Sequence, residues 1–279
     1  MLDQRLDALR ADVKRLGSVL VAFSGGADSA FLLATAAEVL GPAHVVAATA
    51  VSPSLPAAEL AAAGELAAAL GVDHRTPVTH ELDRPGYVRN GPDRCAWCKG
   101  ELMAVLVPLA AEVGMAAVAT GTNADDAADP FRPGIRAAAA RGARTPLRDA
   151  GLTKADVREA SRRMGLATWD KPAAACLSSR LAYGVEVTAD RLRRVEHAEV
   201  AVRAALGDAG VEPTDLRVRD LGDAARVEVD AGLVPLVTGL PAVVDAVRGA
   251  GFATVEVDPR GFRSGSMNDA LRERPASTA

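Results

Sequence analysis

Cysteine and aromatic residues are scarce in this chain, and basic residues do not outnumber acidic ones. Only 3 of 279 residues are cysteines, an odd number that is not the pattern of a disulfide framework. Phe, Trp and Tyr make up 3%, which argues against an aromatic stacking surface for single-stranded nucleic acid. The 32 Lys and Arg against 36 Asp and Glu give a net charge of −4. Nucleic acid is therefore not an expected partner.

Long hydrophobic runs are also missing. No apolar stretch approaches the ~18 residues of a membrane-spanning helix. The segment 1–16, MLDQRLDALRADVKRL, has the charged, amphipathic pattern of a helix and not that of a signal peptide. We therefore expect a cytoplasmic location and no membrane partner. Hydrophobic residues still make up 49% of the chain, which is enough for a substantial core in one or two domains.

Short apolar runs alternate with segments of helical periodicity up to about residue 166. Strands are expected at 18–23, 44–50, 73–79 and 116–120. Helices are expected at 2–16, 28–40, 56–70, 97–113 and 153–164, the last with Thr153 as its N-cap. This alternation is typical of βαβ units. It predicts an α/β domain with a parallel sheet over residues 1–166.

The pattern changes over residues 167–279. Helices are expected at 188–210 and 240–250, and strands at 215–220, 225–230 and 254–258. The first two of these strands flank Leu221-Gly222-Asp223, which predicts a hairpin. We therefore expect a smaller C-terminal α+β domain, which also carries Cys176.

The segment 24–29, SGGADS, lies between the first expected strand and the next helix. Gly25 and Gly26 allow a sharp turn and a close approach of the backbone to an anion. The N-terminus of the following helix attracts phosphate, and the hydroxyl groups of Ser24 and Ser29 add donors. Asp28 would repel phosphate unless a Mg²⁺ ion lies between them. The segment therefore predicts a nucleotide phosphate site with a metal ion.

Two further segments follow expected strands. Thr49 ends the second strand, and Gly121-Thr122-Asn123 follows the fourth. Ligands of open parallel sheets bind at the carboxyl ends of the strands. Thr49, Gly121 and Asn123 are therefore candidate nucleotide-binding residues.

The cysteines leave several interpretations open. Cys95 and Cys98 form a C-x-x-C just before the expected helix at 97–113, which suits a redox pair, half of a zinc site or half of an iron–sulfur site. Cys176 has Lys171 and Arg180 nearby in the sequence, and both favour its thiolate. Together the three cysteines can hold a 4Fe–4S cluster with one open iron, which would act as a sulfur carrier. Otherwise Cys176 is an independent nucleophile, or the three thiols are unrelated.

The remaining candidates are charged or aromatic. Arg217 and Arg219 are two apart on an expected strand, so they project from one face and suit a substrate phosphate. Ser179 and Arg180 follow Cys176 closely and are further candidates for that phosphate. Trp97 is a candidate stacking partner for adenine or for another aromatic ring of a ligand. Glu199, a possible Mg²⁺ ligand, and Glu228 complete the set.

Five motifs occur in a fixed order: SGGADS, RCAWCK, GTNADD followed by RPG, KPAAACLSSR, and LRVRDLGDAARVEV. The first resembles the pyrophosphate loop of the N-type ATP pyrophosphatases, which have the adenine nucleotide alpha hydrolase-like fold. Together, over residues 15–265, they resemble the LarE family of ATP-dependent sacrificial sulfur transferases. These enzymes belong to the pathway that builds the nickel-pincer nucleotide of lactate racemase.

The resemblance implies a reaction. ATP and Mg²⁺ adenylate a carboxylate of a pyridinium biscarboxylic acid mononucleotide, with release of pyrophosphate. A protein sulfur displaces AMP and leaves a thiocarboxylate, and two rounds convert both carboxylates. In the sacrificial form, Cys176 loses its sulfur by β-elimination and becomes dehydroalanine. In other members three cysteines hold a 4Fe–4S cluster that delivers sulfide. The presence of Cys95 and Cys98 favours this second form.

The resemblance also implies partners and leaves alternatives. We expect a small-molecule substrate, a homo-oligomer and a downstream nickel-insertion protein. One alternative is a tRNA thiolase of the same superfamily, which the negative charge disfavours. Another is an amide-forming synthetase of the NAD or GMP synthetase type, which would need no cysteine. A third is a regulatory domain that binds nucleotide without turnover.

Overall fold

The computed structural model describes residues 1–128, 133–172 and 176–269. It divides into two compact units. The first contains 1–87 and 92–174, and the second contains 88–91 and 175–279. Parts of two motifs, Arg132 and the alanines at 173–175, lie outside the described residues. Among those that are described, no single helix is long and apolar enough to cross a membrane, and the one helix pair that passes on length and composition is bent by 87°.

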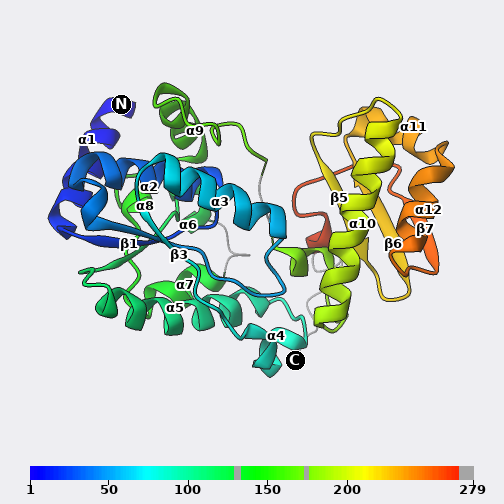
Figure 1. The fold of residues 1–279 in the computed structure, drawn as a ribbon, viewed down its shortest axis with the longest axis horizontal. Helices are drawn as coiled ribbons and strands as arrows, with labels where there is room; N and C mark the ends of the chain where they lie inside the picture. Colours follow the sequence, from blue (N-terminus) through cyan, green and yellow to red (C-terminus); the bar gives the residue numbers. More distant parts are fainter. Residues whose placement is uncertain (129–132, 173–175, 270–279) are drawn as a thin grey trace, which may run out of the picture. The chain divides into compact units, whose positions relative to one another are not determined.

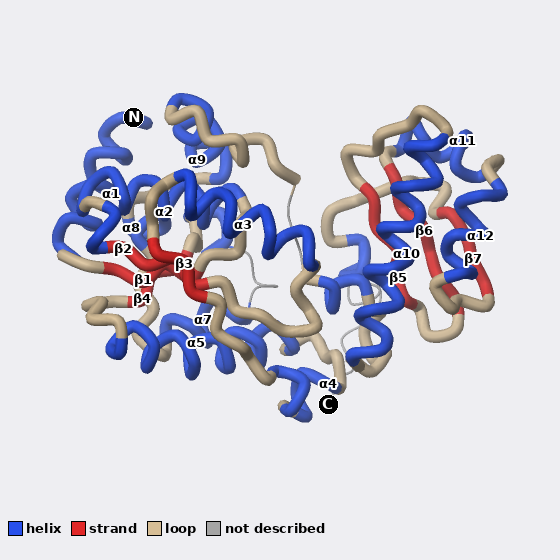
Figure 2. The backbone as a smooth tube through the Cα atoms, viewed as in Figure 1, coloured by secondary structure: helices blue, strands red, loops and turns tan. Residues whose placement is uncertain are grey.

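The first unit contains a parallel four-stranded sheet with the order β3-β2-β1-β4 (Figure 2). Its strands are β1 (Val19–Ala22), β2 (Val45–Ala48), β3 (Asp73–Arg75) and β4 (Val118–Thr120). The predicted parallel α/β sheet is therefore confirmed. Successive strands run outward from β1 to β3, whereas β4 lies on the other side of β1. This change of direction is where open α/β sheets bind ligands.

Helices cover both faces of this sheet. The helices up to residue 172 are α1 (Leu2–Leu16), α2 (Ala27–Leu40), α3 (Ala57–Ala69), α4 (Pro85–Val88), α5 (Arg94–Glu112), α6 (Ala124–Ala128), α7 (Pro133–Ala139), α8 (Pro146–Asp149) and α9 (Lys154–Arg163), with short 3₁₀ turns at Pro42–His44 and Glu81–Asp83. In Figure 1, α1, α2 and α3 lie on one side of the sheet, and α5 and α7 lie on the other.

The core of the first unit has two layers, one on each face of the sheet, because successive side chains of a strand point to opposite faces. On β1, Val19 and Val21 belong to the layer that contains residues of α1, α2 and α9. Leu20, between them, packs instead with Met103 and Leu106 of α5. Both faces of β1 are therefore apolar, as a buried parallel strand requires.

The second unit has a three-stranded sheet of order β5-β6-β7. Its elements are β5 (Leu216–Asp220), β6 (Ala224–Val229), β7 (Thr254–Val257), α10 (Ala189–Asp208), α11 (Val234–Thr238) and α12 (Pro241–Gly249), with 3₁₀ turns at Leu177–Arg180, Ala231–Leu233 and Ser266–Asn268. β5 and β6 form the expected antiparallel hairpin, and β7 joins β6 in parallel. That parallel pairing needs a crossover, which α11 and α12 supply.

The division between the units differs from the predicted boundary at 166/167. Residues up to 172 remain with the first unit because Arg158 donates to the carbonyl groups of Trp169 and Lys171, at 3.3 and 3.1 Å. The segment 88–91 belongs instead to the second unit. There the amide of Asn90 donates to the carbonyls of Ala182 and Val185, both at 2.8 Å. No local pattern in the sequence indicates this contact.

Candidate functional site

The SGGADS segment forms the turn that follows β1 and the first turn of α2, which begins at Ala27. Gly25 has a φ of +71°, a conformation that favours glycine, and a Cβ atom there would lie 3.5 Å from the Cβ of Ala63 on α3. Among the described residues, no side chain caps the N-terminus of α2 at Gly26. The first-turn amide groups of α2 therefore keep the character of an anion-binding helix end.

The two serines of this loop differ in their surroundings. The hydroxyl of Ser29 donates to the carbonyl of Gly26 at 3.1 Å and accepts from the backbone N–H of Ser24 at 3.3 Å. It is also 3.1 Å from the hydroxyl of Ser24. Ser29 is buried, whereas Ser24 is exposed and Asp28 is half-buried. Ser29 therefore holds the loop in shape, while Ser24 and Asp28 are more exposed to solvent.

The turn after β4 lies directly against this loop. A Cβ atom on Gly121 would lie 2.7 Å from the backbone nitrogen of Ser29 and 2.9 Å from its Cα atom. Only a glycine allows this approach, because such distances are well inside van der Waals contact. The sheet order thus brings Gly121 and the phosphate loop together, since β1 and β4 are neighbours.

Asn123 is fully buried beside this turn. Its side-chain oxygen accepts from the backbone N–H of Asp126 at 2.9 Å. Among the described residues its side-chain NH₂ group has no hydrogen-bond partner. A buried donor without a partner costs free energy. This NH₂ group fits a role in nucleotide binding, which stays a prediction.

Thr49 has a different environment from the other candidates. Its hydroxyl donates to the carbonyl of Phe23 at 2.8 Å and lies 2.8 Å from Nε2 of His74. Since that hydroxyl donates to Phe23, its oxygen accepts from the imidazole N–H. Burial lowers the pKa of His74, and the neighbouring charge of Asp73 partly opposes this. Thr49 thus links the residue that follows β1 to β3, and a nucleotide contact by its hydroxyl stays a prediction.

The C-x-x-C lies within a helix, contrary to the expectation that it precedes one. α5 begins at Arg94, because the carbonyl of Asp93 accepts from Ala96 N–H at 2.8 Å and closes an additional turn. Cys95 and Cys98 are therefore three apart on one helix face. Cys95 is exposed and Cys98 is half-buried.

Trp97 lies between these cysteines in the sequence, and its ring is held in place. Its indole N–H donates to the carboxylate of Asp93 at 2.8 Å. The ring also covers Gly86 on α4, where a Cβ atom would lie 2.0 Å from a ring carbon. The side chain is still 42% exposed. A stacking role for the free part of the ring stays a prediction.

In the second unit, Cys176 precedes the 3₁₀ turn Leu177–Arg180, and its side chain is exposed. Its sulfur lies 3.2 Å from the hydroxyl of Ser178. Its carbonyl accepts from the hydroxyl of Ser179 at 2.7 Å and from the guanidinium of Arg180 at 3.0 Å. The backbone of Cys176 is thus fixed while its thiol faces outward, which suits a nucleophile.

The side chain of Arg180 is held in place by an ion pair with Glu199. It is 4% exposed and donates to both carboxylate oxygens of Glu199 on α10, at 2.9 and 3.1 Å. Glu199 also accepts from the backbone N–H of Val218 on β5 at 3.1 Å. These contacts give Glu199 a structural role, and its proposed contact with Mg²⁺ stays a prediction.

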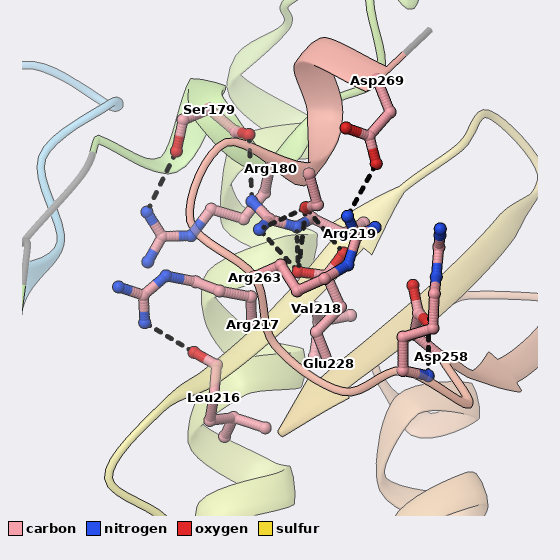
Figure 3. Close-up of polar contacts among 12 residues, drawn as sticks. Ser179, Arg180, Leu216, Arg217, Val218, Arg219, Glu228, Asp258, Arg263 and Asp269 are labelled. Carbon is pink, nitrogen blue, oxygen red and sulfur yellow. Dashed lines mark hydrogen bonds and ion pairs between the residues drawn. The ribbon is translucent and has the colours of Figure 1, made fainter. Parts of the chain in front are cut away.

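Arg219 forms a second buried ion pair. It donates to Glu228 on β6 through two nitrogens, at 2.6 and 2.9 Å, and to the carbonyl of Ser179 at 3.3 Å. Ser266 donates to the same carboxylate at 3.0 Å. Arg219 therefore joins β5, the strand on which it lies, to the 3₁₀ turn that follows Cys176 (Figure 3).

Arg217 completes a group of three neighbouring guanidinium ions. It donates to the carbonyl of Leu216 at 2.6 Å, and its guanidinium carbon lies 5.4 Å from the centre of the Phe262 ring. Burial lowers the pKa of Arg217, and repulsion from Arg180 and Arg219 lowers it further. Figure 3 shows the Arg180 and Arg217 side chains extending toward the same side. Such a partly compensated positive cluster suits an anionic ligand.

The three cysteines fall in different units, with Cys95 and Cys98 in the first and Cys176 in the second. Within the described part of each unit, no group of three His, Cys, Asp or Glu side chains forms a metal site. The helical pair supplies two thiols of the kind that iron–sulfur clusters use. The 4Fe–4S cluster stays a prediction.

For two residues of the site, the sequence did not reveal the contact that the side chain makes. Ser266 lies far from Glu228 in the sequence, and only the fold brings their side chains together. Lys171 was considered only for its nearness to Cys176 in the sequence, yet its side chain contacts the phosphate loop. The position of Lys171 close to Cys176 in the sequence singled out this lysine, but it did not indicate that the lysine contacts Gly25.

Comparison with known proteins agrees with the motifs. The model of the asparagine synthase family matches residues 3–92, which include the phosphate loop. A Synechocystis sp. protein described as uncharacterized is 40% identical over 274 residues, covering 97% of this chain and 99% of the relative. The pyridinium-3,5-bisthiocarboxylic acid mononucleotide synthase of Lactiplantibacillus plantarum is 36% identical over 271 residues, covering 97% of this chain and 96% of that enzyme.

The asparagine synthase match ends at residue 92 and lies mostly in the first unit, whereas the match to the mononucleotide synthase covers 97% of the chain and so spans both units. The resemblance read from the five motifs is therefore confirmed. The chain belongs to the family of the pyridinium-3,5-bisthiocarboxylic acid mononucleotide synthases, within the superfamily of pyrophosphate-loop proteins.

Proposed function

We propose that this protein is an ATP-dependent, AMP-forming sulfur transferase. Its substrate is a pyridinium biscarboxylic acid mononucleotide, whose carboxylates it converts to thiocarboxylates for the nickel-pincer nucleotide. The observation that carries this proposal is an exposed cysteine, Cys176, fixed beside buried arginines in a chain 36% identical to a named mononucleotide synthase. An amide-forming synthetase would have no use for this thiol.

The first unit binds ATP in this proposal. Its uncapped α2 N-terminus, the Ser24 hydroxyl and the close turn at Gly121 suit the triphosphate. Asp28, in the first turn of α2, is the residue we propose to hold Mg²⁺. The ion, when bound, would stabilise the charge that develops on pyrophosphate as it leaves.

Adenylation solves a chemical problem that the substrate presents. A carboxylate repels nucleophiles, and oxide is a poor leaving group. Converting the carboxylate to an acyl-adenylate supplies AMP as the leaving group. The nucleophile must then be ionised sulfur, because the thiolate and not the thiol attacks.

The second unit recognises the substrate and presents the sulfur in this proposal. Arg217 and Arg180 suit the phosphate of the mononucleotide, because guanidinium groups bind phosphate through paired hydrogen bonds. Ser178, whose hydroxyl lies 3.2 Å from the sulfur, can donate to the thiolate of Cys176. That thiolate attacks the acyl carbon and AMP departs. Loss of a proton from Cα then breaks the Cβ–S bond, leaving a thiocarboxylate and dehydroalanine.

Cys95 and Cys98 support the alternative source of sulfur. We propose that they and Cys176 are the three ligands of a 4Fe–4S cluster, which would supply a replaceable sulfide when bound. The protein would then supply three thiolate ligands and leave the fourth iron without a protein ligand. We further propose that the protein acts as a homo-oligomer and passes its product to a nickel-insertion protein.

The test uses the protein purified without oxygen, with Mg-ATP and the biscarboxylic mononucleotide. We expect Cys176→Ala to form no thiocarboxylate while it still binds ATP and releases pyrophosphate. Lys14→Met, an exposed change on α1, serves as the control and should behave as the unaltered protein. Thiocarboxylate formation by Cys176→Ala at the normal rate would contradict the proposal.

A further inference from the structure

Lys171 contacts the phosphate loop of the first unit from a distant part of the chain. Its ammonium group donates to the carbonyl of Gly25 at 3.1 Å. It also forms an ion pair with Glu59 of α3, with 2.6 Å between Nζ and Oε2. The side chains of Lys171 and Glu59 are 22% and 24% exposed. This pair is therefore partly buried and is screened by water less than a surface pair would be.

The ammonium group has capacity for another contact. A lysine has three N–H donors, and the described residues use two of them, for Gly25 and Glu59. Lysine is a compact charge on a flexible stem, so it can keep one partner while exchanging another. Gly25 belongs to the loop whose backbone turns toward the N-terminus of α2. An anion bound at that helix end would lie within reach of the same ammonium group.

We propose that Lys171 binds the pyrophosphate portion of ATP and exchanges Glu59 for a phosphate oxygen when the nucleotide binds. Glu59 acts as the counter-ion of Lys171 in the empty loop and competes with the phosphate for it. This competition weakens the binding of the leaving pyrophosphate and favours its release. The inference rests on the proposed function, because it assumes that ATP is the nucleotide of the loop.

The two partners of the pair should then act in opposite directions. Removing the lysine takes away a charge-assisted contact with phosphate, whereas neutralising Glu59 removes its competitor. A purely structural ion pair predicts something different. Losing either partner would then loosen the loop and weaken ligand binding in the same direction. The sign of the Glu59 effect therefore separates the two interpretations.

The experiment measures the affinity for ATP, AMP and inorganic pyrophosphate by calorimetry. We expect Lys171→Met to weaken ATP and pyrophosphate binding by about tenfold to a hundredfold, the range for a charge-assisted hydrogen bond. AMP binding should change much less, because AMP lacks the pyrophosphate portion. We expect Glu59→Gln to strengthen pyrophosphate binding by about threefold or more. Lys14→Met on α1 and Glu65→Gln on α3, both exposed, are the matched controls and should change nothing.

Two results would overturn the proposal. One is weaker pyrophosphate binding by Glu59→Gln; the other is an equal loss of AMP and pyrophosphate affinity in Lys171→Met. If Lys171→Met does not fold, Glu59→Gln decides alone, since it keeps the shape of the side chain. The assay needs no sulfur acceptor, so failure of sulfur transfer leaves this result intact. A protein that binds no ATP would overturn both the proposed function and this inference.

Discussion

The guanidinium of Arg219 and the carboxylate of Glu228 form an ion pair with 2.6 Å between Nη2 and Oε2, and the two side chains are 6% and 0% exposed. Across β5 and β6, Arg219 is paired with Arg226, and Glu228 is paired with Arg217. Arg219 and Glu228 are therefore diagonal neighbours in the hairpin, and the pairing of the two strands brings them together. Because the same guanidinium reaches the carbonyl of Ser179, this pair also supports the turn that follows Cys176. The stability of the candidate substrate site therefore depends on it.

Neutralising one partner should show how much the pair matters. We expect Glu228→Gln to lower the free energy of unfolding by about 3–5 kcal/mol, because it leaves the buried charge of Arg219 uncompensated. Glu256→Gln is the control. Its pair with Arg226 on the same sheet is exposed, and its loss should cost at most about 1 kcal/mol. Urea denaturation measures both, and equal costs would show that burial does not govern this pair.

Gly121 should tolerate no side chain. We expect Gly121→Ala to displace the first turn of α2, because its Cβ atom would lie 2.7 Å from the nitrogen of Ser29. A displacement of about 1 Å at a reacting group costs roughly a hundredfold in rate, so pyrophosphate release should fall by about that factor. Gly207→Ala on α10, where the added Cβ meets nothing within 4 Å, should leave the rate unchanged. Normal release by Gly121→Ala would mean that the loop adapts.

His74 should make stability depend on pH. Burial lowers the pKa of His74 below its ordinary value of 6.5, so the unfolded chain binds more protons below that value. Its contribution is therefore complete above pH 6.5 and is lost as the pH falls through the lowered pKa. His74→Gln can still donate to Thr49 but does not titrate.

Urea denaturation at about pH 8 and about pH 5 gives the measurement for His74. The advantage of the unaltered protein over His74→Gln should shrink from the first pH to the second. A constant difference would contradict this prediction, because it would mean that the pKa of His74 is the same in the folded and the unfolded chain.

Iron and acid-labile sulfide content decides the source of sulfur. If the three cysteines hold a cluster, protein purified without oxygen should contain about four of each per chain. Cys95→Ala should lose the cluster, and Lys99→Ala, in the same turn of α5, should keep it. If reconstitution yields no iron, Cys176 is the sulfur donor, and mass spectrometry after turnover should find dehydroalanine at that position.

Local pattern was enough to predict most elements of the fold. The predicted helix 2–16 matches α1, and Thr153 caps α9 with a reciprocal hydrogen bond to Asp156. These features depend on neighbours within one or two turns, so the sequence displays them directly. β3 is shorter than the predicted 73–79 and ends at Arg75, and Pro77 lacks the N–H that a continuing ladder would use.

The residues that the sequence interpretation missed have partners far along the chain. Asn90 lies in a segment that the sequence does not distinguish from a loop. In the structure it is fully buried, has a φ of 54°, and donates from its side chain to the carbonyl of Ala182. Thr49 was named as a candidate nucleotide-binding residue, which stays a prediction, but the sequence did not reveal the contacts of its hydroxyl with Phe23 and His74. A single sequence does not show such pairings, because they depend on which strands become neighbours.

The sequence by itself determined the phosphate loop, the parallel α/β unit, the arginine hairpin and the family. Each of these rests on short-range spacing: glycines next to a helix start, alternation along a strand, or motifs in a fixed order. Only the tertiary structure decided that Gly121 lies against Ser29, that Glu228 neutralises Arg219, and that Lys171 shares its charge between Glu59 and the phosphate loop. Close approaches and buried charges need partners from separate elements, and packing alone selects those partners.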